Sequence, residues 1–124
     1  MKEIAGIFIT AGLGLLIASP SLAQDQAADG KKLFTMQCGS CHSVEAGKNG
    51  VGPSLAGVVG RHAGSLPGFN YSQALKNSGI VWDEKSLDGW VTNPVKDVPG
   101  ARMYFAGVSD ATKRQAIIAY LKSL

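Results

Sequence analysis

The sequence predicts an all-α domain with long ordered loops, and three observations support this prediction. Helical patterns occur near both ends of the domain, in residues 27–42 and 109–124. Between them, residues 43–70 contain seven glycines, so we expect no long helix or strand there. The chain also shows neither an internal repeat nor the alternating pattern of a strand.

The two terminal helices are expected to pack against each other. Gly30 and Phe34 lie on one face of the first helix. Gly30 lowers helix propensity, and the compensation we expect is the close approach of another backbone at that point. The last helix begins with Ser109 as its N-cap and Asp110 in its first turn. The simplest arrangement crosses the two helices near Gly30 and Phe34.

Two short helices are expected in the middle of the chain, over residues 71–77 and 83–92. The second should end before Asn93-Pro94, because proline disfavours helical backbone in the residue that precedes it. The remaining connections are predicted to be loops.

Cys38-Gly39-Ser40-Cys41-His42 has the C-x-x-C-H form of a covalent haem attachment site. Each thiol can add across one haem vinyl group, and a short helical turn brings both thiols and the following imidazole within reach of one porphyrin. His42 is then placed to bind the iron as its proximal ligand.

A C-x-x-C pair can also be a redox dithiol, a disulfide or half of a zinc site. No βαβ pattern surrounds this pair, as a thioredoxin-like site would require. The chain has only these two cysteines, and its other histidine, His62, has no partner at metal-ligand spacing. Attachment of one haem through Cys38 and Cys41 is therefore the favoured interpretation.

Residues 1–23 have the layout of a signal peptide. A short start with Lys2 and Glu3 precedes an apolar run over residues 4–18 and a stretch of small residues that ends at Ala23. Cleavage after Ala23 would leave residues 24–124 as a single domain. A membrane span needs about 20 apolar residues, so an uncleaved anchor is the second interpretation. Export to the periplasm agrees with haem attachment, which bacteria complete outside the cytoplasm.

The mature chain would keep the formal charge of +3, because Lys2 and Glu3 leave together. No run of like charge is long enough to indicate nucleic-acid binding. An acidic protein surface is the more natural partner. A domain of this size buries a limited share of its surface, and a haem would supply a large apolar plate for the chain to wrap.

Three side chains could occupy the second axial position of the iron. Met36 lies two residues before Cys38 on the proximal helix, so core packing is its preferred interpretation. Met103 lies in the loop 99–105, which can carry a thioether over the opposite haem face. Met103 is favoured over His62, with ordinary core packing as the alternative for Met103.

Nearly the whole mature chain resembles a class I c-type cytochrome of the mitochondrial and α-proteobacterial type. The stretches that carry this resemblance are Gly30-Lys31-Lys32-Leu33-Phe34, Cys38 to His42, Gly52-Pro53-Ser54-Leu55, Gly57-Val58-Val59-Gly60-Arg61, Gly68-Phe69-Asn70-Tyr71-Ser72, Gly79-Ile80-Val81-Trp82, Asn93-Pro94, Pro99-Gly100, Met103 and Phe105-Ala106-Gly107. The resemblance implies the small cytochrome c fold, in which helices and long loops wrap around one covalently attached haem.

The resemblance also implies roles for five further residues. The Pro53 carbonyl would accept a hydrogen bond from the proximal imidazole and so fix the ring. Arg61, Tyr71 and Trp82 would surround a buried haem propionate, because a carboxylate that leaves water needs hydrogen-bond donors. Phe105 would lie near the distal haem edge.

The chain departs from the commoner mitochondrial pattern on the distal side. Trp90 stands where that pattern has a tyrosine, and an indole does not reproduce the geometry of the hydroxyl near the methionine sulfur. Ala101 replaces a threonine that helps to cover a propionate, and Leu75 replaces an asparagine. With fewer polar groups, the distal side should hold a smaller water network. Val95 also stands at one position of the family's lysine-rich docking ring.

Ligation by His42 and Met103 leaves no open coordination site, which favours one-electron transfer over substrate catalysis. We therefore expect a soluble, monomeric electron carrier rather than an enzyme, which shuttles between larger redox enzymes of a respiratory or related chain and meets the membrane only through partner complexes. The alternatives are a permanently bound or anchored subunit of a redox complex, and a ligand-binding or peroxidase-like haem protein if Met103 detaches easily.

Transient docking to acidic redox proteins would need a basic surface around the exposed haem edge. The candidates are Lys31, Lys32, Lys48, Lys96 and Arg102. For each of them, an ordinary solvated surface residue is the alternative interpretation.

Overall fold

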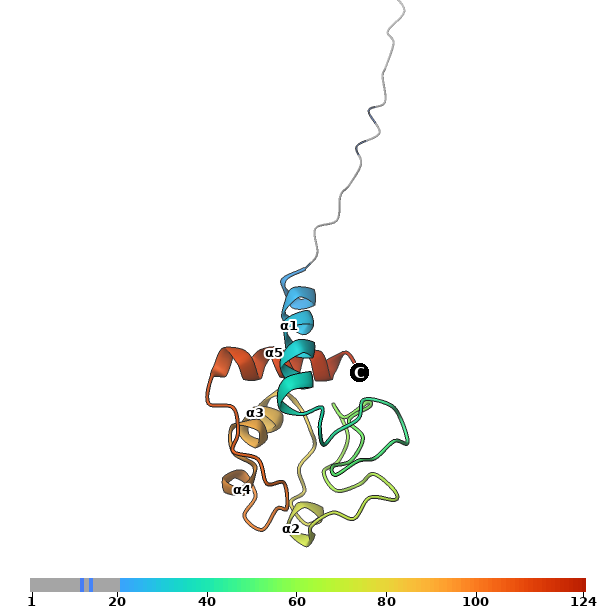
Figure 1. Cartoon of the computed structure of the whole chain (residues 1–124), viewed down its shortest axis with the longest axis vertical. Helices are drawn as coiled ribbons and strands as arrows, with labels where there is room; N and C mark the ends of the chain where they lie inside the picture. The colour runs from blue at the N-terminus through green and yellow to red at the C-terminus, as the bar shows by residue number, and fades with distance from the viewer. Residues whose placement is uncertain (1–11, 13, 15–20) are drawn as a thin grey trace, which may run out of the picture.

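The computed structural model describes residues 12, 14 and 21–124 (Figure 1). Its helices are α1 (Leu22–Gln37), α2 (Gln73–Lys76), α3 (Glu84–Thr92), α4 (Pro94–Asp97) and α5 (Ala111–Lys122). Apart from one isolated bridge between His62 and Val81, the described part of the chain contains no β-structure. The all-α prediction is therefore confirmed. The predicted signal peptide lies almost entirely outside the described residues, and none of the described helices is both long and apolar enough to cross a bilayer.

Helices α1 and α5 cross each other at the position that the sequence predicts (Figure 1). A Cβ atom added to Gly30 would lie 1.8 Å from the carbonyl oxygen of Ala116, so only glycine allows this approach. One turn further along α1, the ring of Phe34 meets that of Tyr120 with 5.4 Å between the ring centroids.

The first helix differs from the predicted range 27–42 at both ends. It begins earlier, because Ser21 and Gln24 form a reciprocal capping box. It ends before Cys38, and at this end the N–H groups of Cys38 and Gly39 both donate to the Phe34 carbonyl. The motif of two cysteines and a histidine therefore lies just after the helix rather than inside it.

The last helix begins one residue later than predicted, and Ser109 is not its N-cap. Asp110 takes that place, and its carboxylate accepts a hydrogen bond from the Lys113 N–H at 2.9 Å. Arg114 in the next turn donates to the Val108 and Ser109 carbonyls, which places Ser109 outside the helix. Residues 123 and 124 also lie beyond it.

Capping residues determine where the middle helices begin. The helix predicted over 71–77 is shorter and begins after Ser72, whose hydroxyl accepts from the Leu75 N–H. The helix predicted over 83–92 is α3, with Asp83 as N-cap. Asn93 ends α3 and caps α4, a helix that the sequence analysis did not predict and that begins with Pro94 in its first turn.

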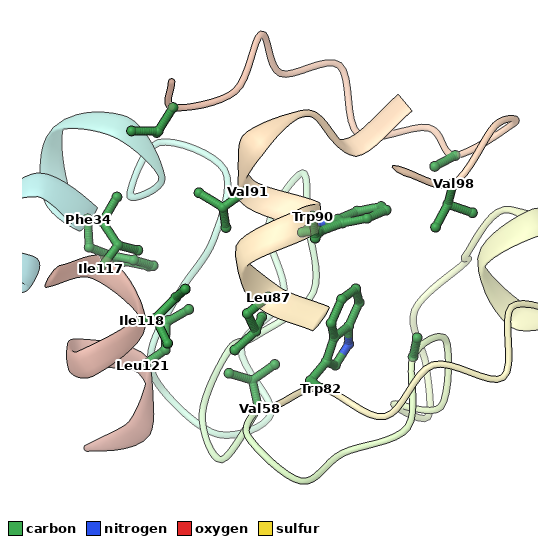
Figure 2. Packing of buried hydrophobic residues seen from close by; sticks show 13 residues of the cluster. Phe34, Val58, Trp82, Leu87, Trp90, Val91, Val98, Ile117, Ile118 and Leu121 are labelled. Atoms are coloured by element: carbon green, nitrogen blue, oxygen red, sulfur yellow. The ribbon is translucent and has the colours of Figure 1, made fainter. Parts of the chain in front are cut away.

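The core lies where α1, α3 and α5 meet (Figure 2). Phe34 from α1, Leu87 and Val91 from α3, and Ile117 and Leu121 from α5 are all buried. Two ion pairs also join α3 to α5, between Asp88 and Arg114 and between Glu84 and Lys122. The three longer helices thus form a frame from which the loops 38–72 and 98–110 extend.

Replacing Gly30 by alanine should force the terminal helices apart. We expect Gly30→Ala to lower the free energy of unfolding by about 3 kcal/mol, because the new methyl group would meet a backbone carbonyl that has no alternative rotamer. Denaturant unfolding of the haem-loaded protein measures this change. Asp29→Ala, at an exposed neighbour in the same helix, should stay within about 0.5 kcal/mol of wild type. Equal losses in the two variants would contradict the helix-crossing argument.

The Asp83 cap should make stability depend on pH. Hydrogen bonds from the backbone N–H and the side chain of Ser86 hold the pKa of Asp83 below its ordinary value. A lowered carboxyl pKa in the folded state stabilises the fold above the unfolded-state pKa of about 3.9, and this contribution is lost as pH falls through the folded-state pKa. Asp83→Ala should therefore lower the denaturation midpoint near neutral pH, and the difference from wild type should shrink in acid. A difference that is constant with pH would contradict this role.

Candidate functional site

The two thiols and the imidazole lie on one tight turn after α1. The N–H groups of Cys41 and His42 both donate to the Cys38 carbonyl, at 3.1 and 3.0 Å. The thiols are not joined in a disulfide; Cys38 is half-buried and Cys41 is exposed. Burial raises the pKa of Cys38 to about 11, and the nearby Cys41 thiol adds to the shift. The turn predicted from the motif is confirmed.

The imidazole of His42 is fixed from one side. Its Nδ1 atom lies 2.7 Å from the Pro53 carbonyl oxygen, which requires a proton on Nδ1 and leaves Nε2 as the free nitrogen. Burial lowers the pKa of His42, with a smaller contribution from Arg61, and together these effects outweigh the Pro53 hydrogen bond. A lowered pKa favours the neutral form of His42, which is the form that can bind a metal ion.

Gly52 makes room for this ring. A Cβ atom at position 52 would lie 2.3 Å from the His42 Cε1 atom and under 3 Å from both ring nitrogens. The Gly52 N–H donates to the Cys41 carbonyl at 2.9 Å, so the same residue holds the loop against the turn. This role of Gly52 was not predicted from the sequence, where Gly52 is only part of a motif.

Ser54 locks the loop that carries Pro53. Its side chain is fully buried, and its hydroxyl donates to the Glu45 carbonyl at 2.6 Å. Its N–H donates to the Asn49 side chain, and its own carbonyl accepts from the Arg61 guanidinium at 2.9 Å. Sequence reasoning missed Ser54 as well, and its only signal was its place between Pro53 and Leu55 in the motif.

Backbone pairing brings Arg61 next to Trp82. The Trp82 N–H donates to the Arg61 carbonyl, and the Gly60 N–H donates to the Trp82 carbonyl, at 2.9 and 2.7 Å. The bridge between His62 and Val81 continues this pairing. His62 is exposed.

A cavity of about 440 Å³ opens between the turn and the helices. Its apolar wall includes Phe34 from α1, Leu75 from α2, Leu87 and Trp90 from α3, and Ile117 and Leu121 from α5. The eight residues predicted to bind the haem all line this cavity: Cys38, Cys41, His42, Pro53, Arg61, Tyr71, Trp82 and Phe105.

The three candidates for the second axial position are placed differently. Met103 is half-buried and lines the cavity together with His42. The Met36 side chain is 78% exposed and, like His62, does not line it. The preferred interpretation of Met36 as a core residue is therefore wrong: α1 turns this side chain to solvent, because the buried face of the helix is that of Gly30 and Phe34.

The donors along the cavity suit a large apolar group that carries carboxylates. Arg61 and Arg102 line it, and no aspartate or glutamate does so among the described residues. Trp82 and Trp90 are buried residues with 5.4 Å between their ring centroids (Figure 2), and both line the cavity. The residues therefore fit a haem tethered by the two thiols.

The residues that differ from the mitochondrial pattern lie in the cavity wall, in the core and on the surface. Trp90 and Leu75 line the cavity, so both contribute apolar surface where that pattern has polar groups. Ala101 is buried in the core but does not line the cavity. Val95 on α4 is exposed.

Comparisons by family model, by sequence and by structure agree with one another. Residues 27–124 match the family model described as Cytochrome c. The chain is 54% identical over 97 residues to cytochrome c2 iso-2 of Magnetospirillum fulvum, covering 78% of this chain and 100% of that protein. It is 45% identical over 122 residues to cytochrome c2 of Blastochloris viridis, covering 98% and 91%. The structure of cytochrome cH from Methylobacterium extorquens matches with a TM-score of 0.75 at 50% identity, covering 79% of this chain and 98% of that one.

Gly52→Ala should displace the imidazole of His42. The added methyl group would overlap the ring, so we expect a loss of about 1–3 kcal/mol in the free energy of unfolding and a changed absorption spectrum of the haem-loaded protein. Glu45→Gln, an exposed substitution in the same loop, should change neither property. An unchanged spectrum in Gly52→Ala would contradict the predicted overlap.

Proposed function

Because the chain belongs to the cytochrome c family and carries haem c on Cys38 and Cys41, we propose that it is a one-electron carrier with His42 and Met103 as axial ligands. The bound haem supplies an iron atom that accepts and releases one electron. The protein itself fixes the ligands, excludes water and presents a surface to partners.

The observation that carries the proposal is the contact between His42 and Pro53. The hydrogen bond from Nδ1 to the Pro53 carbonyl leaves Nε2 unprotonated at the cavity, and it increases the basicity of the ring as a ligand. Gly52 and Ser54 keep the ring and the carbonyl in this relation. The proximal ligand is thus preorganised by the loop.

The position of Met103 at the cavity also supports the proposal. It is the only methionine among the described residues that lines the cavity, and a thioether is a weak donor that suits an iron already held by an imidazole. With both axial positions filled by protein side chains, no position is left for a substrate, so we assign electron transfer rather than enzymatic activity.

Arg61, Tyr71 and Trp82 would hold the haem carboxylates. Arg61 donates to the Ser54 and Ala56 carbonyls, and these two contacts fix its guanidinium without any contribution from a haem carboxylate. Tyr71 is buried and packs against Phe69 with 4.9 Å between the ring centroids. Fixed donors need little rearrangement when the charge of the iron changes, which favours rapid electron transfer.

Export to the periplasm is part of the proposal, with cleavage after Ala23. This cleavage would remove Ser21, the N-cap of α1, together with the first two residues of that helix. The closely packed part of α1, around Gly30 and Phe34, lies beyond the cut and would keep its contacts with α5. The domain 24–124 would therefore keep its helical frame.

Transient docking to acidic redox partners would use exposed basic side chains, with the carrier acting as a monomer. Lys31, Lys32 and Lys96 are exposed, and no ion pair is found for them in the described part of the chain. Lys48 pairs with Glu45 at 3.4 Å, so its charge is partly compensated. Exposed charges of this kind give salt-sensitive association.

Absorption spectra of the oxidised protein test the ligand assignment. Wild type should show the weak near-infrared charge-transfer band of sulfur-ligated ferric haem, and Met103→Ala should lose it because no other thioether lines the cavity. Met36→Ala is the matched control and should keep the band, since that side chain points to solvent. A wild-type spectrum that lacks the band and is high-spin would replace the carrier assignment with ligand binding or peroxidase chemistry.

A further inference from the structure

Asn49-Gly50 is a chemically labile dipeptide in the loop that follows the haem attachment motif. An asparagine followed by glycine loses ammonia readily, because glycine has no side chain to hinder attack by its backbone nitrogen. The sequence contains no other Asn-Gly pair. Its two Asp-Gly pairs, Asp29-Gly30 and Asp88-Gly89, lie inside α1 and α3, where helical hydrogen bonds direct the glycine N–H along the helix axis. Asn49 and Gly50 lie outside the helices, and both are exposed.

The reaction requires the Gly50 nitrogen to reach the Asn49 side chain. This nitrogen gives up its proton and forms a bond to the Asn49 Cγ atom, while the bond from Cγ to Nδ2 breaks and ammonia leaves with that proton. Water then opens the resulting succinimide ring at one of its two carbonyl carbons. Opening at Cγ gives aspartate. Opening at the main-chain carbonyl carbon gives isoaspartate, in which the main chain runs through Cγ.

The folded loop holds both reacting groups in other contacts. The Asn49 Oδ1 atom accepts a hydrogen bond from the Ser54 N–H at 2.9 Å, and the Gly50 N–H donates to the Gly52 carbonyl at 2.9 Å. Turning the Asn49 side chain toward the Gly50 nitrogen would break the first contact. Removing the proton from that nitrogen would break the second. Deamidation therefore competes with two hydrogen bonds of the folded loop.

The far end of this loop is anchored from several sides. Ser54 is only 1% exposed, and its hydroxyl donates to the Glu45 carbonyl at 2.6 Å. The next residue, Leu55, donates from its N–H to the Ser43 carbonyl at 2.9 Å. The Ser54 N–H is thus a fixed donor, and it releases the Asn49 side chain only when the loop opens locally.

We propose that Asn49-Gly50 is a deamidation site that the closed loop 49–54 protects, so that the reaction marks chains in which this loop has opened. Pro53, whose carbonyl is hydrogen-bonded to His42, lies inside the loop. Isoaspartate adds a methylene group to the main chain and turns the side-chain carbonyl that Ser54 binds into a main-chain carbonyl. A loop altered in this way cannot close around Pro53 as before.

Peptide mapping by mass spectrometry measures the reaction, because deamidation replaces an amide by a carboxyl group, and chromatography separates isoaspartate from aspartate. The haem-loaded protein is incubated at one pH and temperature, folded in sodium chloride and unfolded in guanidinium chloride of the same ionic strength. We expect Asn49 to deamidate at least about tenfold more slowly in the folded protein. Equal rates would overturn the inference, as would an unfolded chain in which Asn49 does not react.

Ser54→Ala tests whether the loop itself gives the protection. This variant loses the hydrogen bond to the Glu45 carbonyl, so the loop should open more often and the folded-state rate at Asn49 should rise roughly fivefold. Ser65→Ala is the matched control, because the Ser65 hydroxyl also donates to a backbone carbonyl at 2.6 Å, that of His62, in a different loop. Its rate at Asn49 should equal that of wild type.

Asp83→Ala controls for a general loss of stability, because it removes the N-cap of α3 and leaves the loop 49–54 unchanged. The inference is supported if Ser54→Ala alone raises the folded-state rate. It is overturned if Ser54→Ala leaves the rate unchanged, or if Asp83→Ala raises it equally, because deamidation would then follow global unfolding.

A denaturant series on wild type makes the same distinction without a variant. Below the unfolding transition, deamidation through local opening should change little with guanidinium concentration, whereas deamidation through global unfolding would rise steeply with it. A steep rise would overturn the inference, and a flat profile supports it. Since peptide mass is the readout, none of these outcomes alters the electron-carrier assignment.

Discussion

The hydrogen bond between His42 and the Pro53 carbonyl is the contact on which the rest of the site depends. The proline ring fixes its own φ angle, so the residue that bears the accepting carbonyl has less backbone freedom. The buried Ser54 extends this restriction, because it is tied to Glu45, Asn49 and Arg61. The orientation of one imidazole is thus a property of the whole loop from residue 43 to residue 61.

The cavity and the hydrophobic core share their walls. Phe34, Leu87, Ile117 and Leu121 belong to the buried cluster and also line the cavity. A haem in this position therefore replaces core side chains rather than adding a group to a finished core. This arrangement suits a domain of about 100 residues, which has little apolar surface to bury by itself.

The features that sequence could predict are those set by local spacing. The turn that joins Cys38, Cys41 and His42, the close approach at Gly30 and the end of α3 before Pro94 all follow from residues near one another in the chain. Competition between two neighbouring caps explains the error at the start of α5. Ser109 and Asp110 are both good N-caps, and the carbonyl of Ser109 is taken by Arg114.

The features that sequence could not supply depend on contacts between distant segments. The fit of Gly52 against the His42 ring, the backbone pairing of Arg61 with Trp82 and the exposure of Met36 each require the folded chain. The family resemblance placed Arg61 and Trp82 in one site, but only the structure shows that Arg61 is held by the Ser54 carbonyl.

The crossing of α1 with α5 also bears on how long the thiols stay accessible while the chain folds. Gly30 and Ala116 lie far apart in the sequence, and bringing them together closes a long loop, which costs chain entropy and slows folding. Cys38 and Cys41 follow α1 directly, so the segment that bears the thiols has no completed helical frame beside it until that loop closes. The unfolded chain therefore exposes both thiols, and closure of the terminal helices ends that interval.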